Sequence, residues 1–106
     1  MKRDTTYKAR FEALRSVAFG GIGAAYAVVG AVTDDEVEIS LVHNATDADL
    51  LLSFDGVTDH CFLPAWSQRV IDWNTNDKVL GNRTQFWVKH NGVAPTQGAI
   101  YIEVTV

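Results

Sequence analysis

Strict alternation of apolar and polar side chains, in two separate segments, is the feature that most limits how this chain folds. Glu36–Leu41 places Val37, Ile39 and Leu41 at alternate positions, and Ala99–Val106 shows the same spacing. Because successive side chains of a β-strand point to opposite faces, a period of two is typical of a strand with one buried face. Both segments therefore predict half-buried strands. The expected inward residues are Val37, Ile39 and Leu41 in the first, and Ile100, Ile102, Val104 and Val106 in the second.

Short strands and polar turns fill the rest of the sequence. Turn residues at Asn44–Asp49 precede Leu50, Leu52 and Phe54, whose spacing predicts a strand paired with the first one in a hairpin. Only Tyr7–Leu14 is a candidate helix. Further strands are expected at Cys61–Leu63, Gln68–Trp73 and Thr84–Lys89, with one or two between Val17 and Val32 and turns such as Asn74–Asp77 between them. Seven or eight short strands predict an all-β fold, an antiparallel β-sandwich or jelly roll.

A length of 106 residues, 47% of them apolar, is that of one folded domain with a modest core. We expect this domain to cover residues 16–106, after an N-terminal arm at 1–15. A core of this size leaves room for a partner to bury much further surface. The lone Cys61 has no second cysteine with which to form an internal disulfide.

Charge is divided unequally between the arm and the body. Residues 1–15 hold five basic and two acidic side chains, a net charge of +3, whereas residues 16–106 hold four basic and eleven acidic ones, a net charge of −7. An acidic body repels phosphate backbones, so nucleic acid is not an expected partner. A basic arm suits the acidic body of a neighbouring copy, and a solvated, frayed terminus is the alternative.

An uncharged segment, Ser16–Thr33, follows the basic arm and has the outline of a signal peptide or membrane anchor. Four glycines weaken a helix of this marginal length, namely Gly20, Gly21, Gly23 and Gly30. We therefore expect turns and close backbone contacts here rather than a membrane partner.

The residues with catalytic or metal-binding potential do not form a known arrangement. His60 and Cys61 are adjacent and would point to opposite faces of a strand, and His43 and His90 have no ligand spacing with them. Asp55–Asp59 shares features with a calcium loop, but a tight turn explains it more simply. We expect no enzyme, no catalytic or metal site and no cofactor.

Three tryptophans are candidates for binding. With Phe86 and Val88 pointing inward, the pleat turns Trp87 outward; Trp66 follows a proline in an apparent turn, and core packing is expected for Trp73. Exposed indoles anchor protein interfaces or stack on sugar rings. One alternative is therefore a carbohydrate-binding module, with Trp66 and Trp87 as a platform and Asp55 and Asp59 binding hydroxyl groups.

Several blocks occur in an order that resembles one family. They are Val17–Gly30, His43–Asp49, Ser53–His60, Leu63–Ala65, the pair Val88-Lys89 and Pro95–Tyr101. Their order is similar to that in a group of small virion proteins of tailed bacteriophages. The resemblance implies a non-catalytic β-sandwich of the virion that decorates the capsid or joins parts of the neck and tail. At Trp66-Ser67-Gln68 such proteins tend to have a glycine-rich turn, so this loop departs from the pattern.

Together these observations predict a homo-oligomer that binds other virion proteins, such as capsid, neck or tail subunits. We expect the arm to dock on an adjacent subunit, where exposed indoles bury apolar area. The expected interface residues are Lys2, Arg3, Lys8, Arg10, Phe11, Arg15, Trp66 and Trp87.

Overall fold

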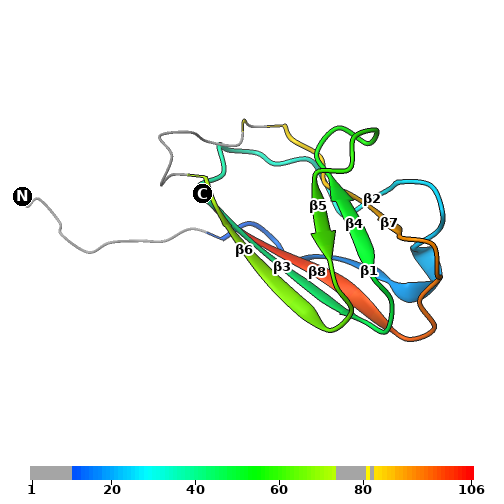
Figure 1. The fold of residues 1–106 in the computed structure, drawn as a ribbon. Coiled ribbons are helices and arrows are strands. Elements are labelled where there is room, and N and C mark those ends of the chain that lie inside the picture. Colours follow the sequence, from blue (N-terminus) through cyan, green and yellow to red (C-terminus); the bar gives the residue numbers. More distant parts are fainter. Residues whose placement is uncertain (1–10, 74–80, 82) are drawn as a thin grey trace, which may run out of the picture.

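The computed structural model describes residues 11–73, 81 and 83–106, and it is a sandwich of two antiparallel four-stranded sheets (Figure 1). The first, which we call the long sheet, has the strand order β1 (Arg15–Ala18), β8 (Gly98–Thr105), β3 (Ile39–Thr46), β6 (Ser67–Asp72). The second, the short sheet, has the order β2 (Ala27–Val28), β7 (Trp87–His90), β4 (Leu50–Ser53), β5 (Cys61–Leu63). The predicted all-β fold is confirmed.

The core lies between the sheets and draws on both. Its buried apolar residues include Val42, Ile100 and Ile102 from the long sheet, and Leu52 and Val88 from the short sheet. The prediction for β8 is confirmed, because its isoleucines and Val104 are fully buried while Tyr101 is exposed. Burial of these side chains is the main stabilising contribution to a fold of this size.

Trp73 packs against this core, as predicted. Its indole ring meets Phe54 edge to face at 5.3 Å between centroids, and Phe54 meets Phe86 in the same manner at 5.7 Å. The indole N–H donates to Oγ of Ser40 at 3.2 Å, so the one polar atom of the ring is satisfied.

The predicted hairpin between the first two strands is wrong. β3 pairs with β6 and β8, whereas β4 pairs with β5 and β7, so these consecutive strands lie in different sheets. The chain crosses between sheets after Thr46, and the polar residues that resemble a hairpin turn form this crossing. Asn44 is 1% exposed there and hydrogen-bonds to the backbone, which satisfies groups that a buried corner would otherwise leave unpaired.

The predicted inward face of the first strand is only partly right. Val37 is buried, but Ile39 is exposed and Leu41 half-buried, and the buried face of β3 instead carries Ser40, Val42, Asn44 and Thr46. A bend at Glu38 separates Val37 from β3 and inverts the alternation. The carbonyl of Glu38 accepts the N–H of Trp73 and its own N–H reaches Thr105, so the bend is held from both sides.

The segment from Phe11 to Leu14 is not helical. Phe11 forms a bridge with Thr105 of β8, and the N–H of Glu12 donates to the carbonyl of Val104. The rest of the candidate helix, residues 7–10, and the predicted turn at 74–77 lie outside the described residues. Ser16–Thr33 contributes to β1, to a 3-10 turn η1 (Phe19–Gly21) and to β2. No helix in the described chain is long and apolar enough to span a membrane.

Candidate docking surface

The outward face of the long sheet carries a group of exposed apolar side chains, which we call the docking face. Because Ser40, Val42 and the isoleucines of β8 point inward, the alternate residues of each strand point outward. The exposed apolar members are Phe11, Leu14, Ile39, Trp66, Val70 and Tyr101, with the half-buried Leu41 between them. Exposed apolar patches of this kind mark interaction sites.

Strand register brings these side chains together. Leu41 faces Val70 across β3 and β6, and His43 faces Tyr101 across β3 and β8. Phe11 lies opposite Thr105 at one end of β8, where it borders a hollow of about 310 Å³ together with Leu14 and Glu103. The face therefore spans β8, β3 and β6, and Phe11 and Leu14, which precede β1, extend it.

One hydrogen-bonded pair of polar side chains lies among these apolar groups. Nε2 of His43 lies 2.7 Å from Oε2 of Glu103, with 29% and 44% of the two side chains exposed. The pair bridges neighbouring strands and satisfies both polar groups on the docking face, which leaves the apolar side chains around it without a competing unpaired charge.

Trp66 stands at one end of the docking face on a constrained loop. Its φ is 57°, a left-handed conformation in which side-chain-bearing residues are rare, and 61% of its surface is exposed. It lines a shallow hollow of about 190 Å³ with residues of β3 and β6, namely His43, Asn44, Ala45, Ser67 and Gln68. Glycine adopts this φ without strain, whereas a residue with a side chain does not.

Hydrogen bonds hold the Trp66 loop on several sides. The N–H of Trp66 donates to the carbonyl of Thr46 at 3.2 Å, and the N–H of Ala65 donates to the carboxylate of Asp49 at 3.0 Å. The buried amide of Asn44 donates to the carbonyls of Leu63 and Pro64 at 2.9 and 3.0 Å. The indole is therefore presented to solvent by a backbone that is already ordered, which lowers the entropy cost of binding through it.

Two carboxylates, Asp47 and Asp49, lie near the end of the docking face that holds Trp66. Asp49 contacts the loop directly, and Asp47 accepts hydrogen bonds from the N–H of Thr96, at 2.8 Å, and from its hydroxyl. These bonds from Thr96 hold the pKa of Asp47 below its usual range, so this exposed carboxylate is charged at neutral pH. Asp49 therefore places negative charge at the Trp66 loop, and Asp47 adds a second carboxylate close by in sequence.

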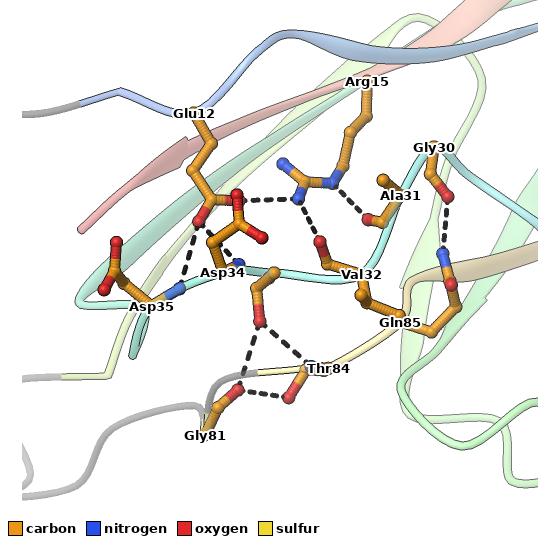
Figure 2. A network of polar contacts seen from close by, with 11 residues as sticks. Glu12, Arg15, Gly30, Ala31, Val32, Asp34, Asp35, Gly81, Thr84 and Gln85 are labelled. Atoms are coloured by element: carbon orange, nitrogen blue, oxygen red, sulfur yellow. Dashed lines mark hydrogen bonds and ion pairs between the residues drawn. The ribbon is translucent and has the colours of Figure 1, made fainter.

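The start of the described chain is fastened to the sandwich by Glu12 and Arg15 (Figure 2). Nη2 of Arg15 donates to Oε1 of Glu12 at 2.6 Å, and Nε donates to the carbonyl of Ala31 at 3.0 Å. The other oxygen of Glu12 accepts the N–H groups of Asp34 and Asp35 at 3.0 and 3.3 Å. Partial burial alone raises the pKa of Glu12, but the hydrogen bonds from these three residues outweigh it and lower the pKa.

Arg15, which was predicted to be an interface residue, is buried in the sandwich. Its side chain is 6% exposed, it lies in β1, and its guanidinium carbon is 5.6 Å from the centroid of the Phe86 ring. The sandwich thus includes Phe11–Arg15, ahead of the predicted boundary at residue 16. Phe11 is exposed, as an interface residue requires, while Lys2, Arg3, Lys8 and Arg10 lie outside the described residues.

Trp87 points outward from the short sheet, as predicted, but it is half-buried rather than exposed. Gly56 in the β4–β5 loop closes over it, and a Cβ at that glycine would lie 2.9 Å from Cε2 of the indole. Trp66 lies by the long sheet and Trp87 on the outer side of the short one, so the two indoles do not share a face.

Asp55 and Asp59 are occupied by contacts within the protein. Asp55 accepts the N–H groups of Thr58 and Val57 and the hydroxyls of Thr58 and Ser53, which lower its pKa well below the usual range. Asp59 accepts the Tyr26 hydroxyl at 2.5 Å and lies 3.4 Å from Nζ of Lys89. The prediction of a tight turn fits Asp55, whose carboxylate organises the loop.

The cysteine and histidines do not converge. Cys61 is half-buried in β5, and burial raises the pKa of its thiol. Nδ1 of His60 accepts the N–H of Phe54 at 3.1 Å, while His43 lies in the opposite sheet, paired with Glu103. Among residues 11–73, 81 and 83–106, no three His, Cys, Asp or Glu side chains are grouped to hold a metal ion.

Sequence analysis missed most of the docking face. The alternation predicts Ile39 and Leu41 in the core because the bend at Glu38 leaves no clear signal in the sequence, and it gives no orientation for Val70. The predicted outward position of Tyr101 is confirmed. Trp66 was found because a tryptophan directly after a proline turn is unlike core packing. The predicted strand that contains Val70 has no clear alternation, because Arg69 precedes Val70 and Ile71 follows it. This absence of a single apolar face is the sequence signal that Val70 lies on the outward side.

Searches of protein-family models and of curated protein sequences give no match to this chain.

Proposed function

We propose that this protein is a structural component of a tailed-phage particle, which binds capsid, neck or tail proteins repeatedly and without catalysis. The observation that carries the proposal is the docking face, where apolar side chains of β3, β6 and β8, together with Phe11 and Leu14 just before β1, stand exposed on one sheet. A particle component acts by repeated binding, for which such a face is suited. The resemblance of the sequence blocks to small virion proteins supplies the biological context.

Rigidity supports the same proposal. Asn44, Thr46 and Asp49 hold the Trp66 loop, and Glu12 and Arg15 hold the first described residues on the sandwich. A surface that is already ordered loses little conformational entropy when it binds, so it is suited to a stable contact with another protein.

Carbohydrate binding is the second candidate, and Trp66 is the observation that favours it. An exposed indole beside a shallow hollow with the polar side chains of His43, Ser67 and Gln68 is suited to stacking on a sugar ring. The two-tryptophan platform envisaged from the sequence is not present, because Trp87 lies on the other sheet and is covered by Gly56. The docking face extends far beyond this hollow, which favours a protein partner.

Quantitative mass spectrometry of purified particles, from cells that produce this chain, tests the proposal. The expected result is a fixed copy number, in the hundreds for capsid decoration and about a dozen for a neck or tail ring. Absence from the particles would contradict the proposal. A glycan array run in parallel separates the alternative: binding that Trp66→Ala abolishes would favour carbohydrate, whereas an empty array favours the structural role.

A further inference from the structure

The direction of the chain at its start bears on what covers the docking face. Phe11 lies opposite Thr105, and Arg15 lies opposite Ile102, so residues 11–15 run along β8 toward the end of the sheet that holds Trp66. Thr46, whose carbonyl binds the N–H of Trp66, lies opposite Gly98 at that far end. The ten preceding residues therefore join the sheet at the end remote from Trp66.

Those ten residues, which we call the leader, have the composition of a partner for the acidic end of the face. The leader contains Lys2, Arg3, Lys8 and Arg10 against one acidic residue, Asp4. Ten extended residues span up to about 33 Å, which is longer than the eight-residue strands β3 and β8.

We infer that the docking face binds the leader of a second copy of this chain, with a cationic leader side chain stacked on the indole of Trp66. This inference rests on the proposed function and names its first partner. Trp66 supplies the exposed ring, and Asp47 and Asp49 supply negative charge beside its loop. Lysine and arginine side chains bind over indole faces when carboxylates nearby add attraction.

A neighbouring copy fits this site better than the chain's own leader. To reach its own Trp66, the leader would have to reverse direction directly before Phe11, whose bridge to Thr105 fixes the local course of the chain. The hydrogen bonds that join Glu12 to Arg15 and Asp34 fix the course of the chain just after Phe11, so these residues do not turn back. A leader that binds the next copy gives a head-to-tail contact, which generates either a closed ring or an open filament.

Two variants of the full chain test the inference by sedimentation velocity. Trp66→Gly removes the indole at a position where φ is 57° and glycine is unstrained, so the variant is expected to fold. The leader variant carries Lys2→Gln, Arg3→Gln, Lys8→Gln and Arg10→Gln together. The wild-type chain is expected to self-associate, and each variant is expected to weaken association at least tenfold. Phe62→Ala, on the outer side of the short sheet, is the matched control and leaves association unchanged.

Mixing the two variants gives the decisive result. Trp66→Gly retains an intact leader and the leader variant retains an intact face, so an equimolar mixture forms a one-to-one dimer that grows no further. A mixture that stays monomeric, or a leader variant that associates like wild type, would overturn the inference. If Trp66→Gly does not fold, Tyr101→Ala replaces it as the variant of the docking face, and the same loss of self-association is expected.

The inference and the proposed function fail in different ways. A wild-type chain that is monomeric in solution yet present in purified particles would refute the leader contact and leave the particle role intact. Self-association through the leader, in a protein absent from particles, would refute the particle role alone.

Discussion

Single residues decide how this sandwich presents its surface. Asn44, Trp66 and the pair of Glu12 and Arg15 each depart from simple burial rules, since two are buried polar groups and one is an exposed indole. Hydrogen bonds join Asn44, Arg15 and the backbone of Trp66 to other parts of the chain, although the buried Nη1 of Arg15 has no partner among the residues that the structure describes. The side chains of Asn44, Glu12 and Arg15 therefore stabilise the fold by joining separate segments through hydrogen bonds.

Asn44→Ala is expected to destabilise the protein by about 3 kcal/mol, because it leaves buried carbonyl groups without their donor. The carbonyls of Ala48, Leu63 and Pro64 accept from this amide, and its oxygen accepts from Thr46. Chemical denaturation measures the loss. Asn91→Ala, at an exposed site, is the control and should change the stability by less than about 0.5 kcal/mol. Equal effects of the two substitutions would contradict the role given to Asn44.

Glu12→Gln is expected to cost about 2 to 3 kcal/mol at neutral pH, because it leaves the buried guanidinium of Arg15 without its counter-charge. The pKa of Glu12 is lowered in the folded state, so its contribution is present above the unfolded pKa and is lost as pH falls through the folded one. The difference between wild type and variant should therefore narrow below about pH 4. Thermal unfolding across pH measures this, with Glu36→Gln as the exposed control. A difference that does not vary with pH would contradict the ion pair.

At the scale of strands, the sequence predicted the elements better than their pairing. β5 and the buried face of β8 were predicted correctly because turns bound the first and a long alternation marks the second. The hairpin of β3 and β4 was wrong because a crossing between sheets uses the same polar residues as a tight turn. Most of the docking face could not be predicted from the sequence pattern, because the bend at Glu38 exchanges the inward and outward residues of β3 without a change in composition.

The close approach of β3 and β8 provides a test of the long sheet. Gly98 has a φ of 90°, and a Cβ there would lie 1.8 Å from the carbonyl oxygen of Ala45. Gly92 also has a φ of 90°, but a Cβ there would meet nothing within 4 Å. Gly98→Ala should therefore cost at least about 3 kcal/mol, and Gly92→Ala only about 1 kcal/mol of backbone strain. Similar denaturation midpoints for both variants would contradict the described packing of β3 on β8.

The whole molecule has a buried layer that stabilises the fold and an exposed layer that is available for binding. The inward residues of both sheets form the core, and the outward residues of the long sheet form the docking face. Substitutions on that face are therefore expected to change assembly while leaving the stability of the domain nearly unchanged.

The most direct test is the amount of Val70→Glu protein incorporated into purified particles, measured by quantitative mass spectrometry. Val70 is 65% exposed on the docking face, and Val57 is 82% exposed in the β4–β5 loop, so Val57→Glu is a matched control. We expect the Val70 variant to fold normally but to be incorporated at less than about a tenth of the wild-type copy number, because a charge is buried at the contact. Normal incorporation of Val70→Glu, or equal loss of both variants, would contradict the central claim.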